Sequence, residues 1–131
     1  MQILESQRQE LMAAALAARA SAYAPYSQFA VGAAVLDASG RIFQGCNVEN
    51  VSFGLTICAE RVAATSAIAA GSRDLAACAV CTPGGGTPCG ACRQFLAEFN
   101  SQMKILLVDA DQPGVWRECD LAKLLPDQFR L

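Results

Sequence analysis

Residues 58–61, Cys-Ala-Glu-Arg, and residues 88–94, Pro-Cys-Gly-Ala-Cys-Arg-Gln, place three thiols and a carboxylate together with arginines in a chain without histidine. Three sulfur ligands can hold a zinc ion and leave its fourth position open, which is typical of a catalytic zinc site. A carboxylate beside that open position can carry protons. We therefore predict one zinc ion per chain, bound by Cys58, Cys89 and Cys92, with Glu60 as the catalytic residue.

The length and composition favour a single domain over residues 1–131, with one sizeable core. The longest apolar run, Leu11–Ala18, is too short to cross a bilayer. Glu5, Arg8 and Glu10 precede it, unlike the basic start of a signal peptide, so we expect a cytoplasmic protein without a membrane partner. Hydrophobic residues make up 53% of the chain, and this excess indicates subunit interfaces and hence an oligomer.

The charge of the chain argues against a nucleic-acid partner. The net charge is −2, and the sequence has no cluster of Lys or Arg to neutralise phosphates. A small, neutral or weakly charged substrate fits this balance better. The seven cysteines are an odd number, so they cannot form a complete disulfide framework within one chain. Metal ligation or reactive thiols explain some of them better.

Hydrophobic periodicity and turn residues predict alternating strands and helices. Pro25 ends the first helix, and Gly71 caps the second. Helices are expected over about residues 3–23, 58–70, 89–99 and 121–125, and strands over about 29–36, 41–47, 75–82, 104–108 and 115–119. The strand–helix–strand order in the middle implies right-handed crossovers. We predict a three-layer α/β/α fold with a central, mixed, five-stranded sheet.

Both cysteine stretches stand at predicted helix starts, so two helix N-termini can meet at one edge of the sheet. Their partial positive charge would offset the negative charge of three thiolates. Arg61 follows Cys58 by three positions, shares its helical face and can donate to its sulfur. Glu60 follows by two positions, which makes it an unsuitable ligand but a possible neighbour of the open position.

Three other interpretations of the cysteines compete with this one. Cys89 and Cys92 at a helix start also fit a thioredoxin-type redox motif, which leaves residues 58–61 unexplained. A structural zinc site would need a fourth protein ligand. Buried small hydrophobic residues are the third interpretation, and the catalytic site is favoured over all three because Glu60 has a role only there. We accept the third interpretation for four cysteines, namely Cys46, Cys78, Cys81 and Cys119.

Motifs along nearly the whole chain resemble the cytidine deaminase family, in particular its small homotetrameric type with three cysteine ligands. Besides the two stretches above, the resemblance is carried by residues 24–27, Phe29, 31–34, 45–50, 124–126 and Phe129. It implies a cytidine deaminase-like fold, a zinc ion, a pyrimidine nucleoside as substrate and a homotetramer with shared active sites. It also implies that Cys58, Cys89 and Cys92 are the zinc ligands and Glu60 the proton shuttle.

The resemblance also implies the substrate contacts. Asn47 and Glu49 match the pair that binds the ribose hydroxyls, and Phe29 matches an aromatic of the base pocket. The backbone of Ala59, Thr87 and Pro88 matches positions that contact the pyrimidine and the departing ammonia. Phe129 matches an aromatic residue of the C-terminal tail that reaches the active site of a neighbouring subunit.

Phe53 is a departure from the family pattern. It stands where the family often has a tyrosine whose hydroxyl helps to hold the 5′ end of the sugar, so this hydrogen bond is missing. Around the metal, Arg61 and Gln94 are expected to lie next to the ligands.

The activity that the resemblance implies is zinc-dependent hydrolytic deamination of cytidine and 2′-deoxycytidine to the uridine forms, with release of ammonia, as in pyrimidine salvage. Two alternatives stay open at this point. The same chemistry can act on another aminated ring, such as an antibiotic nucleoside or a base in nucleic acid. The other alternative is a thiol–disulfide oxidoreductase that uses Cys89 and Cys92.

Overall fold

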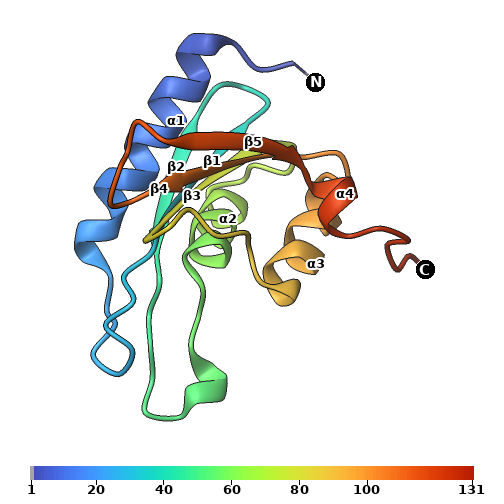
Figure 1. Ribbon diagram of the computed structural model, residues 1–131. Helices are drawn as coiled ribbons and strands as arrows, with labels where there is room; N and C mark the ends of the chain where they lie inside the picture. Colours follow the sequence, from blue (N-terminus) through green and yellow to red (C-terminus); the bar gives the residue numbers. More distant parts are fainter. Residues whose placement is uncertain (1) are drawn as a thin grey trace.

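The structure is a computed structural model that describes residues 2–131, and its centre is a mixed sheet (Figure 1). Its strands, in the order β2-β1-β3-β4-β5, are β2 (Ile42–Cys46), β1 (Gly32–Asp37), β3 (Leu75–Thr82), β4 (Lys104–Asp109) and β5 (Trp116–Asp120). Only the β3–β4 pair is parallel, and the other three pairs are antiparallel. The predicted mixed, five-stranded sheet is thus confirmed.

Helices cover both faces of the sheet, as predicted (Figure 1). Helix α1 (Glu5–Ala18) packs on one face through one hydrophobic cluster, and helix α2 (Ala59–Ala69) packs on the other face through a second cluster, beside α3 (Gly90–Phe99). The short α4 (Leu121–Leu124) follows β5 directly. None of the helices within residues 2–131 has the length and apolar character needed to span a bilayer.

Strand β3 is buried along its whole length, as expected of a strand with helices on both sides. From Ala77 to Cys81 its side chains alternate between the two clusters. Cys78 belongs to the cluster under α2 and α3, whereas Cys81 belongs to the cluster under α1. Because an odd offset on a strand sends side chains to opposite faces, these two thiols cannot share one metal ion.

Two predicted boundaries are wrong. The first helix ends at Ala18 in a 3-10 turn, η1 (Arg19–Ser21), and Tyr23 then donates its backbone N–H to the carbonyl of Asn47. The strand expected from Phe29 begins only at Gly32. The side chain of Asn47 binds the backbone of both Phe29 and Val31 and so takes the place of a strand partner.

The register of the sheet brings three connections to one edge. Gly32, the first residue of β1, lies between Cys46 at the end of β2 and Cys81 near the end of β3. Because β1 is antiparallel to both neighbours, the segment before β1 and the segments after β2 and β3 emerge together. The segment after β2 is an excursion over residues 47–57 that contains the 3-10 turn η2 (Phe53–Leu55) and leads into α2 (Figure 1).

Two glycines allow the helices to approach the sheet closely. A Cβ atom on Gly32 would lie 2.0 Å from the backbone oxygen of Ala15 in α1. A Cβ atom on Gly45 would lie 2.4 Å from the backbone nitrogen of Ala63 and 2.6 Å from the backbone oxygen of Ala59, both in α2. These contacts involve backbone, so α2, which carries Glu60, cannot adjust by rotating a side chain.

We predict that Gly45→Ala displaces α2 and lowers the free energy of unfolding by about 3 kcal/mol, since overpacking against backbone is costly. Urea unfolding measures this change. Gly54→Ala is the matched control, because a Cβ atom at Gly54 meets nothing within 4 Å; its effect should stay within about 0.5 kcal/mol. Equal stability of the two variants would show that α2 does not depend on this approach.

Candidate active site

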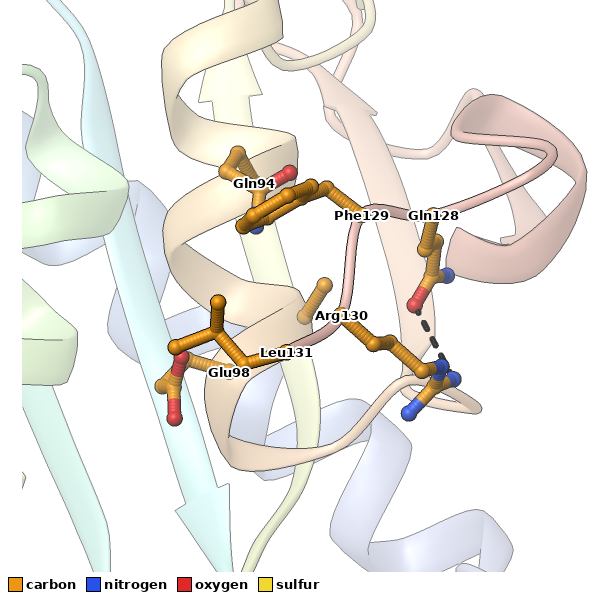
Figure 2. A pocket seen from close by; sticks show the side chains of 7 residues that line it. Gln94, Glu98, Gln128, Phe129, Arg130 and Leu131 are labelled. Carbon is orange, nitrogen blue, oxygen red and sulfur yellow. Dashed lines mark hydrogen bonds between the residues drawn. The ribbon is translucent and has the colours of Figure 1, made fainter.

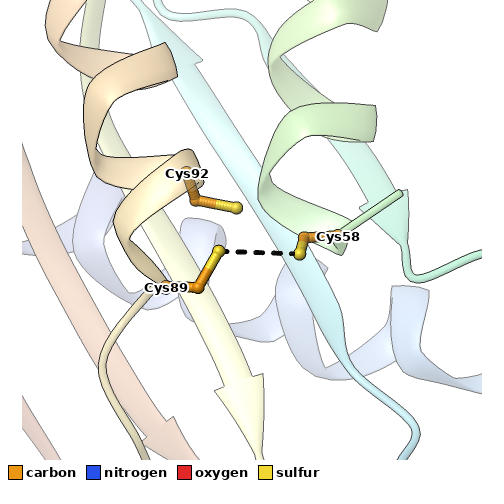
Figure 3. A group of neighbouring side chains, drawn as sticks. All are labelled: Cys58, Cys89 and Cys92. Carbon is orange, nitrogen blue, oxygen red and sulfur yellow. Dashed lines mark hydrogen bonds between the residues drawn. The ribbon is translucent and has the colours of Figure 1, made fainter. Parts of the chain in front are cut away.

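Three thiols meet where the N-termini of α2 and α3 converge (Figure 3). Cys58 is the residue directly before α2, Cys89 is the residue directly before α3, and Cys92 lies in the first turn of α3. Their sulfur atoms all lie within 4.8 Å of one another, and the sulfurs of Cys58 and Cys89 are 3.8 Å apart. The three residues singled out in the sequence thus come together in space.

The donor set fits a zinc ion with an open position. Two sulfurs on a tetrahedral zinc ion with bonds of about 2.3 Å lie about 3.8 Å apart, which matches the Cys58–Cys89 separation. In the part of the chain that the structure describes, no fourth Cys, Asp or Glu joins this cluster. The interpretation as a structural zinc site therefore lacks its fourth ligand. The redox interpretation, in turn, has no use for the thiol of Cys58.

Arg61 lies against the thiol cluster, as its position in α2 predicts. Its Nη2 donates to the sulfur of Cys58 at 3.4 Å. Its Nε is buried and has no hydrogen-bond partner among residues 2–131. A buried donor without a partner is costly, and an electron-rich metal–thiolate cluster next to it would compensate that cost. Three thiolates on Zn²⁺ carry one net negative charge, which the guanidinium and the two helix N-termini offset.

The surroundings already favour ionisation of one thiol in the metal-free protein. A hydrogen bond with Cys92, together with the hydrogen bonds from Arg61 and Cys89, lowers the pKa of Cys58 to about 5. The same hydrogen bond with Cys58, followed by burial, raises the pKa of Cys92. The surroundings therefore favour a thiolate at Cys58 and a thiol at Cys92, and a metal ion would displace the thiol proton because it binds thiolates.

Glu60 lies beside the thiols without being one of the cluster. It stands in the first turn of α2, only 5% exposed, and lines a cavity of about 440 Å³ together with Cys58 and Cys89. Burial and the nearby charge of Cys58 raise the pKa of the Glu60 carboxyl above its usual range. A carboxyl group with a raised pKa holds a proton more readily than an exposed one, which suits a general acid–base role.

The cavity contains most of the predicted substrate contacts. Phe29 comes from the segment before β1, Asn47 and Glu49 from the segment after β2, and Thr87 from the loop after β3. The volume falls in the range of about 300–1,000 Å³ that is typical of small-molecule sites. The other lining residues are Ser27, Val31, Thr56, Ala59 and Thr82.

Six predicted site residues do not line this cavity. Cys92 and Arg61 lie at the thiol cluster instead, and the other four are Pro88, Phe53, Gln94 and Phe129. Pro88 is buried, and its carbonyl accepts a hydrogen bond from Arg93. Phe53 is 72% exposed on η2, where its ring meets the edge of Tyr26 at a centroid distance of 5.7 Å. Gln94 and Phe129 line a separate pocket of about 420 Å³ between α3 and the C-terminal segment (Figure 2). The place of Gln94 next to the metal ligands stays a prediction.

Two residues at the site have contacts that the sequence interpretation did not assign. The guanidinium of Arg93 donates to the carbonyls of Pro88 and Leu124 and to the hydroxyl of Thr87, so it ties the loop before Cys89 to the end of α4. Ser27 donates to Glu49. Arg93 directly follows the proposed metal ligand Cys92, and this position in the sequence could have pointed to it. Nothing local in the sequence marks Ser27.

Comparison with known proteins agrees with this geometry. Residues 5–108 match the family model described as cytidine and deoxycytidylate deaminase zinc-binding region. The chain is 46% identical over 124 residues to a protein named cytidine deaminase from Sporosarcina psychrophila, over 92% of this chain and 90% of the relative. This chain belongs to the cytidine deaminase family. Its matched region contains all three thiols and Glu60.

Solved structures of cytidine deaminases have the same fold. The crystal structure of cytidine deaminase from Burkholderia pseudomallei superposes with a TM-score of 0.87 at 48% identity, over 92% of this chain and 98% of the other. That of the enzyme from Mycobacterium tuberculosis gives a TM-score of 0.83 at 43% identity, over 98% of this chain and all of the other (100%). This member of the cytidine deaminase family is therefore a zinc protein, and Cys58, Cys89 and Cys92 form the cluster positioned to hold the ion.

Proposed function

We propose that this protein is a hydrolase that converts cytidine and 2′-deoxycytidine to uridine and 2′-deoxyuridine and releases ammonia, as pyrimidine salvage requires. One observation carries the proposal: the buried carboxyl of Glu60 lines the same cavity as Cys58 and Cys89, in a chain whose relatives are named cytidine deaminases. We propose Cys58, Cys89 and Cys92 as the metal ligands and Glu60 as the catalytic residue.

Glu60 moves the protons of the reaction. When bound, zinc supplies a Lewis acid that makes water nucleophilic near neutral pH. The carboxylate of Glu60 accepts a proton from the attacking water and delivers it to N3 of the pyrimidine ring. The water oxygen forms a bond to C4. After Glu60 has passed a second proton from that oxygen to the amino group, the C4–N bond breaks and ammonia leaves.

The remaining cavity residues position the nucleoside. Phe29 offers an aromatic ring to the base, and Thr87 and the backbone of Ala59 line the part of the cavity near the thiols. Asn47 and Glu49 offer polar groups for the ribose hydroxyls. We propose Pro88 as a further backbone contact, and Arg61 as the donor that steadies the ligand sulfur.

Glu60→Gln should keep the fold and the zinc but lower kcat by roughly 10²–10⁴-fold, because the amide cannot carry protons. The assay follows the loss of the cytidine ultraviolet band, with zinc content measured on the same sample. Glu10→Gln is the control, since Glu10 is exposed on α1, away from the site. Retention of most of the turnover in Glu60→Gln would exclude the proposed proton carrier, and absence of cytidine turnover in the native protein would exclude the proposed activity.

We further propose that the whole chain, residues 1–131, acts as one catalytic domain in a cytoplasmic homotetramer with shared active sites. Support for subunit contacts comes from apolar side chains that the chain itself leaves exposed, such as Val51 (78%), Phe53 (72%) and Phe129 (73%). Phe129 would complete the site of a neighbouring subunit, and Phe53 would pack near the 5′ end of a sugar. A cluster of free thiols suits a reducing compartment.

Complementation tests the shared site. A variant that ends before Phe129 keeps its own Glu60, and Glu60→Gln keeps its tail, so each alone should have low activity. Co-expression of the two variants should restore a substantial part of the cytidine turnover, because mixed assemblies contain sites with an intact Glu60 and a neighbour's tail. A mixture no more active than the sum of its components would contradict a tail shared between subunits.

A further inference from the structure

We infer that Ser27 is a positioning residue that fixes the carboxylate of Glu49 for a single hydrogen bond from a ribose hydroxyl. The inference rests on the proposed function, since it concerns how the same cavity selects a sugar. Ser27 itself belongs to an exposed turn and lines the cavity beside Glu49. It does not contact the thiol cluster or Glu60 through any hydrogen bond within residues 2–131.

Three donors from one turn converge on the Glu49 carboxylate. The backbone N–H groups of Tyr26 and Ser27 donate to Oε1 at 2.9 and 3.1 Å. The hydroxyl of Ser27 donates to Oε2. The turn that makes this convergence possible is closed by Gln28, which has a positive φ of 59° and donates its backbone N–H to the carbonyl of Ala24. The orientation of the Glu49 carboxylate is therefore set by the turn and not by its own flexible side chain.

The position of the hydroxyl proton follows from the partners of Ser27. The backbone N–H of Phe29 donates to Ser27 Oγ at 3.0 Å, so the hydroxyl is the acceptor there. Its only hydrogen is then free for Glu49, which as a carboxylate can only accept. The hydrogen bond from Ser27, ahead of those from Tyr26 and Ser27 N–H, lowers the pKa of Glu49 and keeps it ionised. Ser27 thus links Phe29, the proposed contact to the base, with Glu49, the proposed contact to the sugar.

The carboxylate of Glu49 has one acceptor position left for a substrate. A carboxylate oxygen accepts about two hydrogen bonds. Oε1 of Glu49 already accepts two, from Tyr26 and Ser27, whereas Oε2 accepts one. The neighbouring Asn47 uses two of its four amide positions within the chain, since its Oδ1 accepts from Val31 N–H and its Nδ2 donates to the carbonyl of Phe29. One acceptor and one donor position of Asn47 are left for the sugar. A sugar hydroxyl that donates to Oε2 therefore finds a preset acceptor, and removal of Ser27 Oγ would let that acceptor turn away.

The test compares, in Ser27→Ala, a ligand that has the 2′- and 3′-hydroxyls of the sugar with one that lacks both. We measure the KM for cytidine and the inhibition constant of 2′,3′-dideoxycytidine as a competitor. Loss of one hydrogen bond to a charged group predicts a rise of about tenfold in the KM for cytidine. The inhibition constant of 2′,3′-dideoxycytidine should change by less than about twofold, because this ligand has no hydroxyl for Glu49 to bind. Ser27→Thr keeps the hydroxyl and should retain the native values.

Ser39→Ala is the matched control. Ser39 donates both its backbone N–H and its hydroxyl to Asp37, as Ser27 does to Glu49, but in the β1–β2 turn, outside the cavity. This variant should leave both constants unchanged. An equal rise of the KM and the inhibition constant in Ser27→Ala, or no rise in either, would overturn the role of Ser27 even if the native protein deaminates cytidine. Absence of native cytidine turnover would instead be the failure of the proposed function and would overturn both.

Discussion

The convergence of two helix N-termini on three thiols is the constraint on which the rest of this molecule depends. Cys58 and Cys89 each stand directly before a helix, and Cys92 follows in the first turn. Thiolates held this close repel one another, so they need compensating positive charge. The helix ends, the guanidinium of Arg61 and the metal supply it. Because only three thiols cluster within residues 2–131, we propose that the fourth position of the ion is left for chemistry and that Glu60, which is buried in the first turn of α2, serves it.

The topology of the sheet brings the other residues of the cavity next to the thiols. Strand β1 is antiparallel to both β2 and β3, so the segments that carry Phe29, Glu49 and Thr87 leave the sheet at one edge. Hydrogen bonds then fix these segments to one another. Asn47 donates to the carbonyl of Phe29, and Ser27 accepts from its N–H, so the residues that we propose to contact the base and the sugar form one connected unit.

Much of this arrangement was predictable from the sequence, and the failures have physical causes. The sheet, the layers and the three thiols follow from periodicity, turn residues and the spacing of the cysteines. The late start of β1 does not, because the side chain of Asn47 replaces a strand partner at Phe29 and Val31. The pocket that Gln94 shares with Phe129 was not predicted either, because it depends on a long-range approach of the C-terminal segment to α3. Ser27 left no local signal, since its partner Glu49 is distant in sequence.

Zinc K-edge X-ray absorption on the purified protein tests the central claim most directly. We expect three sulfur ligands at about 2.3 Å and one lighter atom at about 2.0 Å around each zinc ion. Four sulfur ligands would mean a closed structural site that includes one of the other cysteines, and would contradict the open position on which the chemistry depends. Two sulfur ligands would contradict the joint contribution of both helix N-termini.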